Sequence, residues 1–135
     1  MAKKISVDQL SSEIMSALDE YKKVTDEVVK TAVNSVSKET KAMAQAGSPV
    51  KSGGYQKGWA VKKTSEKTGQ VSITVYNRTK PGLTHLLEKG HAKRGGGRVA
   101  GKPHIAPAEE YAVNELEAAI KRGLSGWIMK RLQTC

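Results

Sequence analysis

The chain has 135 residues, with 23 Lys and Arg against 13 Asp and Glu, and a formal net charge of +10. This length is typical of one domain, so we expect a single domain over residues 1–135. The only cysteine, Cys135, excludes an intramolecular disulfide scaffold. No apolar run approaches the ~20 residues that span a bilayer, and Met1-Ala-Lys-Lys does not begin a signal peptide. These features predict a soluble intracellular protein with no membrane partner.

The charge is concentrated in the middle of the chain. Residues 1–46 carry seven bases and seven acids, and residues 107–135 carry four of each. Residues 47–106 carry twelve bases and only two acids, Glu66 and Glu88. Because Lys and Arg are almost never buried unpaired, this distribution predicts a local electropositive surface. A polyanionic neighbour and a set of solvated loops both remain explanations for it.

Residues 1–46 predict one long helix. Ser6 and Gln9 fit a capping box at its start, and Gly47-Ser48-Pro49 predicts its end. Its apolar stripe slips by one residue after Val28, which suits packing on a sheet better than a sustained coiled coil. Such a helix is about 60 Å long at 1.5 Å per residue. We therefore expect it to project beyond its own core or to break near residue 30.

Residues 47–106 predict a basic region with a small, mainly antiparallel sheet built on a β-hairpin. Alternation of Tyr55, Trp59 and Val61 predicts a strand at 50–63, and residues 71–76 alternate as its partner. Residues 83–89 predict a short helix that Gly90 ends. Residues 90–102 contain five Gly and five Lys, Arg or His, which predicts a flexible basic loop. A further short strand is expected at 104–106.

The last part of the chain predicts a second helix and a tail. Pro107 suits the first position of a helix over 107–123, and Gly123 predicts its end. Residues 124–135 are then a tail that either docks elsewhere or forms a frayed last helix. The order of helix, hairpin, short helix, basic loop and helix predicts the α+β class.

Motifs for catalysis and cofactors are weak. Residues 96–102 match G-x-x-x-x-G-K, but Pro103 stands where a phosphate-binding loop needs Ser or Thr, and no strand precedes it. The histidines match no recurring metal-ligand spacing: they are His85, His91 and His104. No nucleophile turn or framed pair of carboxylates is present. We therefore expect no enzyme, no cofactor, no metal and no small-molecule substrate.

Nucleic-acid binding is the alternative function that the residues themselves support. The bases of the central region could face phosphates, with backbone N–H groups of the glycines adding contacts. These bases are Lys51, Lys57, Lys62, Lys63, Arg78, Lys80, Lys93, Arg94, Arg98 and Lys102. Tyr55, Trp59 and Tyr76 could stack on nucleotide bases, although Tyr55 and Trp59 share a predicted strand face with Val61, which favours core packing. No sequence-specific binding motif is present, so this alternative is sequence-independent.

Five short segments of the chain occur in an order that is typical of one protein family. They are Gly53-Gly54-Tyr55-Gln56-Lys57-Gly58-Trp59, residues 71–77, Leu86-Leu87-Glu88-Lys89-Gly90-His91, the Gly/Arg-rich stretch after it, and Lys102-Pro103-His104-Ile105-Ala106-Pro107-Ala108-Glu109. Together they resemble the tail-completion proteins, also called head–tail joining or neck proteins, of long-tailed bacteriophages. The resemblance covers about residues 45–123.

This resemblance implies a structural protein of the virion neck, assembled in the host cytoplasm. Such proteins form a ring, generally sixfold, between the head-completion or connector proteins and the tail-tube or tail-terminator proteins. DNA passes through the lumen without sequence-specific contact. The low apolar content of 38% suits a subunit that completes its burial against neighbours.

The resemblance also singles out two groups of residues. The positions that match the family motif, and for which it implies a structural role, are Gly53, Trp59, Asn77, Glu88, Gly90, Pro103 and Pro107. The bases of the predicted loop are Lys93, Arg94, Arg98 and Lys102. We hypothesise that these four face the DNA channel or clamp an acidic partner ring.

Overall fold

The computed structural model describes residues 6–134, except for the side chains of Asp8 and Thr134. The inferences about Met1-Ala-Lys-Lys and Cys135 lie outside the described residues. The elements in chain order are α1 (Val7–Gly47), α2 (Gly54–Lys57), β1 (Trp59–Lys67), β2 (Gln70–Asn77), the 3-10 turn η1 (Pro81–Leu83), α3 (Thr84–Lys89), β3 (Gly90–Ala92), β4 (Arg98–Ala100) and α4 (Ile105–Thr134). The predicted α+β class is confirmed.

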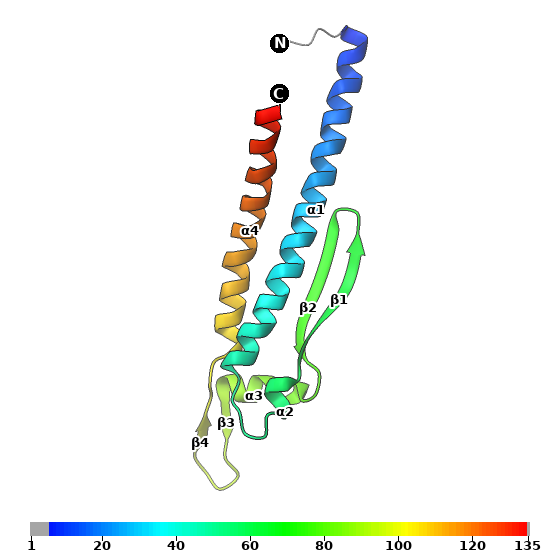
Figure 1. Ribbon diagram of the computed structural model, residues 1–135. Coiled ribbons are helices and arrows are strands. Elements are labelled where there is room, and N and C mark those ends of the chain that lie inside the picture. The colour runs from blue at the N-terminus through cyan, green and yellow to red at the C-terminus, as the bar shows by residue number, and fades with distance from the viewer. Residues whose placement is uncertain (1–5, 135) are drawn as a thin grey trace.

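Two long antiparallel helices, α1 and α4, form the frame of the molecule (Figure 1). The β1–β2 hairpin lies along α1, while α2, α3 and the β3–β4 hairpin gather at one end. We call this end the base, and the opposite end of the helix pair the tip. None of the helices in the described part of the chain is long and apolar enough to cross a membrane.

Helix α1 is continuous over 41 residues, so the predicted break near residue 30 does not occur and the alternative, a projecting helix, is confirmed. Ser6 and Gln9 form the predicted capping box: the Ser6 side chain accepts from the Gln9 N–H, and the Ser6 N–H donates to the Gln9 side chain. At the other end the Ser48 hydroxyl donates to the Ala44 carbonyl at 2.6 Å. Its hydrogen bond contributes to closing the helix before Pro49.

Helix α4 corrects the prediction for the C-terminal part of the chain. Residues 105 and 106 open the helix rather than forming a strand, and the helix runs through Gly123 to Thr134 without a separate tail. Gly123 does not end the helix because it lies directly against Val28 of α1. This close approach uses the missing side chain, and it offsets the helix-breaking tendency of glycine.

The first strand begins later in the chain than predicted. Residues 54–57 form the helical turn α2, and β1 begins only at Trp59. Gly53 has a φ of 85°, which turns the chain into α2, and the buried Tyr55 points to the core instead of alternating along a strand. Local alternation predicted extended backbone here, but the burial of Tyr55 favours a helical turn.

The predicted antiparallel hairpin is confirmed, and β1 ends later than the predicted residue 63. A β-bulge between Lys63 and Ser65 lets β1 continue to Lys67. The strands therefore meet at the two-residue turn Thr68-Gly69, where Gly69 has a φ of 79°. The Gly69 N–H donates to the Asp26 carboxylate at 2.7 Å, which ties this turn to α1.

The core is small and lies near the base. Ala44, Tyr55, Trp59 and Ala108 form its buried cluster. The half-buried side chains packed against this cluster are Val75, Leu87 and Ile105. Because these residues come from α1, α2, β1, β2, α3 and α4, the core joins every larger element at one place.

Substitution of Gly123 tests the packing of the two helices. An added Cβ would lie 2.6 Å from Val28 Cγ1, so Gly123→Gln should lower the free energy of unfolding by about 1–3 kcal/mol. Gly126→Gln is the matched control, because nothing lies within 4 Å of an added Cβ there. It should raise the free energy of unfolding by up to about 1 kcal/mol, since glycine is a poor helix former. Urea unfolding followed by circular dichroism measures the free energy of unfolding of both variants. An equal increase in the two variants would contradict the close packing of Gly123 on Val28.

Candidate interaction site at the base

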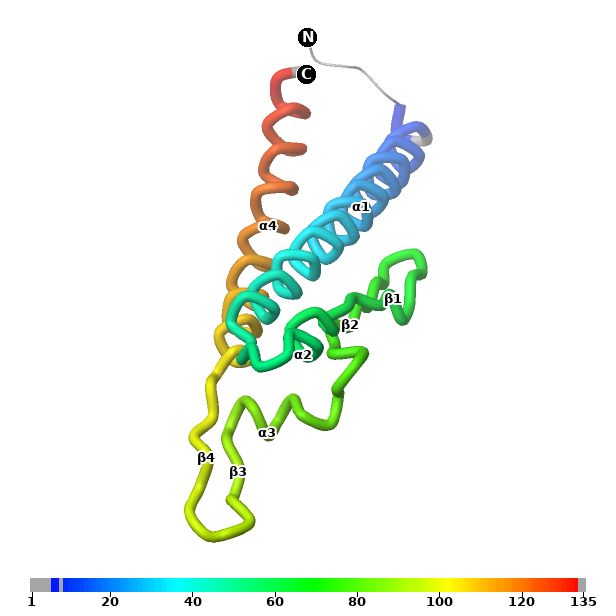
Figure 2. Tube along the Cα trace, turned by 60° about the horizontal axis from the view of Figure 1, so that its bottom comes forward, coloured from blue at the N-terminus to red at the C-terminus, as the bar shows by residue number. Residues whose placement is uncertain are grey.

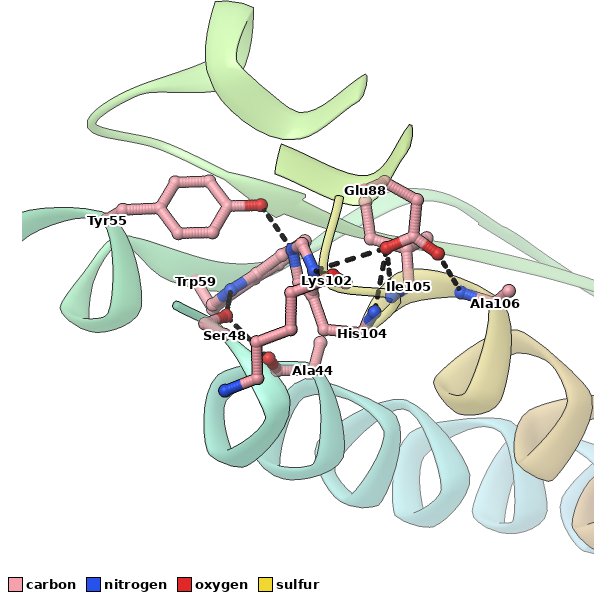
Figure 3. Close-up of polar contacts among 9 residues, drawn as sticks. All are labelled: Ala44, Ser48, Tyr55, Trp59, Glu88, Lys102, His104, Ile105 and Ala106. Atoms are coloured by element: carbon pink, nitrogen blue, oxygen red, sulfur yellow. Dashed lines mark hydrogen bonds and ion pairs between the residues drawn. The ribbon is translucent and has the colours of Figure 1, made fainter. Parts of the chain in front are cut away.

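The start of α4 is capped by a side chain from a different helix. Glu88 of α3 accepts hydrogen bonds from the backbone N–H groups of His104 and Ile105 through Oε2, both at 2.8 Å, and of Ala106 through Oε1 at 2.9 Å (Figure 3). The next residue, Pro107, has no N–H to satisfy. Pro107 therefore lies at the third helical position rather than the predicted first one, and still removes one unpaired donor from the first turn.

The environment of Glu88 keeps its carboxyl group ionised. Burial raises the pKa of Glu88, but the three backbone N–H groups and His104 together lower it by more, so the pKa lies below its ordinary value. The side chain is only 12% exposed, and a carboxylate at a helix N-terminus is also favoured by the helix dipole. Glu88 therefore connects α3 to α4 through charge-assisted hydrogen bonds.

His104 is the second centre of this arrangement. Its side chain is completely buried, and Nδ1 lies 2.7 Å from the Lys102 carbonyl oxygen, which can only accept a hydrogen bond. Nδ1 therefore carries a hydrogen. In the neutral ring Nε2 then accepts from the Tyr55 hydroxyl at 2.6 Å (Figure 3). Burial, followed by the charge of Glu88, raises the pKa of Tyr55, so its hydroxyl remains a donor at neutral pH.

Trp59 completes the cluster that we call the base network, formed by Ser48, Tyr55, Trp59, Glu88 and His104. The indole Nε1 of Trp59 donates to Ser48 Oγ at 2.7 Å. The three ring pairs among Tyr55, Trp59 and His104 have centroids 5.5–6.0 Å apart and pack edge to face. The network links the end of α1, α2, β1, α3 and the start of α4 through satisfied buried polar groups.

The family-motif positions all lie at or beside this network. Asn77 is buried and donates to the Tyr55 carbonyl at 2.7 Å, and its Oδ1 accepts from the Lys80 N–H at 2.9 Å. Gly90 has a φ of 83° and passes so close to the Val99 carbonyl that a side chain would not fit. Pro103 directly precedes His104 and is exposed.

The stretch predicted as a flexible loop forms a second β-hairpin. Gly90 pairs with Ala100, His91 with Val99 and Ala92 with Arg98. The turn is possible because Gly96 and Gly97 have φ values of 94° and 79°, and the Lys93 N–H donates to the Gly97 carbonyl. The composition predicts a flexible loop because this stretch has no alternation of apolar residues. The backbone pairing of β3 with β4 leaves no such pattern in the sequence.

This hairpin forms the outermost part of the base (Figures 1 and 2). It carries three of the four predicted contact residues, Lys93, Arg94 and Arg98, while Lys102 follows β4. Lys93, Arg94, Arg98 and Lys102 are all exposed. Lys93 and Arg94 lie in the turn, Arg98 begins β4, and the Lys102 N–H anchors the chain to the Leu87 carbonyl at 2.8 Å. Between residues 67 and 108 the only acid is Glu88, and its carboxylate is already engaged by α4. The positive charge of the hairpin is therefore not compensated by acids of the same region.

The other residues of the predicted polyanion surface fall into different places. Lys51, Lys57, Arg78 and Lys80 are exposed on or next to α2 and on the segment after β2, while Lys62 and Lys63 lie along β1. Lys63 pairs with Glu66 at 2.7 Å. The aromatic residues do not form a stacking platform, because Tyr55 and Trp59 are buried in the base network. The basic surface is therefore built from charge, without exposed stacking by these two rings.

Sequence reasoning missed the structural roles of Ser48, Tyr55 and His104. The sequence predicts a helix stop at Ser48, a core-facing strand position for Tyr55 and a short strand at His104, and none of these predictions contains the hydrogen bonds that join the network. No group of three or more metal-ligating residues lies together in the described part of the chain. The available signal was the Pro-His-Ile-Ala-Pro segment, in which a histidine stands immediately before a helix start.

Glu88→Gln tests the cap. The amide would present its NH2 group to a backbone N–H, so we expect a loss of about 1–3 kcal/mol in the free energy of unfolding at pH 7. Glu66→Gln is the matched control, because Glu66 is exposed and pairs with the equally exposed Lys63. Its free energy of unfolding should stay nearly unchanged. Equal effects of the two substitutions in urea unfolding would contradict a capping role.

The Glu88→Gln substitution also predicts how the stability of the chain depends on pH. The pKa of Glu88 is lower in the folded chain than its ordinary value of 4.5, so its stabilising contribution is complete above that value. It disappears as the pH falls through the lowered pKa. The difference between the wild type and Glu88→Gln should therefore shrink below about pH 4. A difference that stays constant down to pH 2 would show that ionised Glu88 is not the stabilising species.

Comparison with known proteins identifies the family of the chain. A family model described as "Bacteriophage HK97-gp10, putative tail-component" matches residues 12–90. This match includes most of α1, the β1–β2 hairpin and α3 with Glu88. No curated protein and no solved structure matches the chain significantly. Because the matched segment covers more than half of the sequence, the chain belongs to the HK97-gp10-like family of bacteriophage tail components, with a structural role in the virion.

Proposed function

We propose that this tail component is a tail-completion protein that forms a ring at the head–tail interface and joins the tail to the DNA-filled head. Family membership supports a tail role, and the order of the sequence segments supports the tail-completion type. In this proposal the ring is sixfold, and it contacts the head-completion or connector proteins on one side and tail-tube or tail-terminator proteins on the other. Its place is the neck of the virion, and it assembles in the host cytoplasm without catalysis.

The observation that carries the proposal is the exposed basic hairpin at the base. The hairpin is held by Gly90, whose position excludes a side chain, and by the Lys102 anchor to Leu87. The hairpin extends away from the helix pair (Figure 2). Such an arrangement suits sequence-independent contact with phosphates of DNA in a lumen. An acidic ring of a partner protein is the other polyanion that the four bases could meet.

Loss of the protein during infection tests the joining role. Without it, DNA-filled heads and complete tails should accumulate separately, and adding the purified chain to the extract should join them. Electron microscopy and a plaque assay measure the outcome. Normal joined particles in its absence would overturn the proposal, and so would failure to make tails at all.

Charge reversal of the hairpin tests the role of the four bases. Changing Lys93, Arg94, Arg98 and Lys102 to Glu should reduce joined, DNA-retaining particles at least about tenfold, because like charges repel at close range. The matched control changes four exposed lysines of the helices, Lys22, Lys23, Lys38 and Lys130, to Glu, with the same change in net charge. Unchanged assembly and DNA retention in the hairpin variant would contradict the role.

A free-standing nucleic-acid-binding protein is the second candidate, because the base is basic as a whole. The affinity for duplex DNA, measured at two salt concentrations, distinguishes this candidate from the neck protein. The neck protein should bind duplex DNA weakly and without sequence preference, with a log–log salt slope no steeper than about −4 for four phosphate contacts. Submicromolar binding with a much steeper slope would favour the second candidate.

A further inference from the structure

The β-bulge at Thr64 divides the β1–β2 hairpin into two parts. Between the bulge and the base, five residue pairs form the ladder, and beyond the bulge three pairs lead to the turn. The turn lies at the end of the hairpin that points away from the base (Figure 1). Because a bulge interrupts the ladder and bends the strand, it is the natural hinge between the two parts. We call residues 64–72, the part with the turn, the strap.

The two parts of the hairpin are held to the rest of the molecule in different ways. Nearer the base, Trp59 belongs to the buried core cluster, Val75 packs against that cluster and Asn77 is buried. Within the strap, Val71 is the only apolar residue of the sequence, and it is half-buried. Burial of apolar surface therefore fixes the part near the base and contributes little to the position of the strap.

A cavity separates the strap from α1. Its volume is about 300 Å³. Tyr21, Thr25 and Val29 line it from α1, and Gln70 and Val71 line it from the strap. Side chains that face a cavity lack the dispersion contacts of a packed interface. Segments with few buried apolar contacts open locally at a lower cost in free energy than the core.

The turn of the strap is attached to α1 by the Asp26 carboxylate. Asp26 accepts a hydrogen bond from the Gly69 N–H at 2.7 Å and pairs with Lys30 at 3.0 Å. The hydrogen bond from Lys30, followed by that from Gly69, lowers the pKa of Asp26. The carboxylate is therefore ionised at neutral pH, and its bond to Gly69 is charge-assisted. This contact holds the strap closed over the cavity.

We propose that the strap is a movable element with two positions, a closed one held on α1 by Asp26 and an open one in which the hairpin bends at Thr64. Opening breaks the contact of Asp26 with Gly69 and exposes the half-buried Val29 and Val71, while the core cluster stays intact. The subunit can thereby change shape at this hairpin without unfolding. The inference goes beyond the proposed ring and does not depend on it.

Distance measurements between two spin labels test the movement. The labels are attached at Lys23→Cys on α1 and Thr68→Cys in the turn, both exposed positions, in the full chain with Cys135→Ser. Double electron–electron resonance should give one main distance, with an open population below about 5%. Asp26→Ala should lower the ratio of closed to open molecules about tenfold, because it removes a hydrogen bond to a charged group. A second, longer distance should then account for about a third of the molecules.

The matched control is Asp19→Ala, which removes the same charge from an exposed position of α1 that does not line the cavity. Its distance distribution should equal that of the parent chain. A second label pair, Lys23→Cys with Lys62→Cys on the part of β1 nearer the base, should keep its distance when Asp26→Ala is added. An unchanged distribution for the turn label in Asp26→Ala would overturn the proposal. A shift of the Lys62→Cys label as large as that of the turn label would also overturn it, because the whole hairpin would then move without a hinge at the bulge.

Discussion

The structure depends on one interaction, the capping of α4 by the Glu88 carboxylate. Three backbone N–H groups at the start of α4 converge on this side chain, which comes from the last turn of α3. A helix start normally uses a cap from the residue just before it, but here that residue is His104, whose ring is taken up by Tyr55 and Lys102. The distant carboxylate therefore fixes α4 against α3, and it also sets the position of the β3–β4 hairpin between them.

This capping has an electrostatic consequence for the whole base. Residues 47–106 contain twelve bases and two acids, and Glu88 and Glu66 are each engaged, one by α4 and one by Lys63. Glu88, the acid nearest to the hairpin in the sequence, thus holds α3 and α4 together. The base is left with a positive surface, which attracts a polyanion and raises its local concentration.

Local signals predicted the elements whose causes are local. The Ser6 and Gln9 capping box, the alternation at 71–76 and the Gly90 helix stop each act within a few residues, and the structure has them where the sequence indicated. The errors arise where a distant contact decides. Gly123 lies against Val28 and so does not end a helix, and Tyr55 turns inward to meet His104, 49 residues away in the chain. Glu88 matches a motif position, but its role as acceptor for three backbone N–H groups depends on α3 and α4 meeting in space, which no spacing rule contains.

The proposed place of this tail component is the head–tail junction, with its basic hairpin facing DNA or an acidic partner ring. Imaging of the assembled particle by electron cryomicroscopy tests it most directly. The account predicts a rotationally symmetric ring of this chain between head and tail, with Lys93, Arg94, Arg98 and Lys102 on the lumen side. A chain located elsewhere in the tail, or a hairpin that faces neither DNA nor an acidic partner surface, would contradict it.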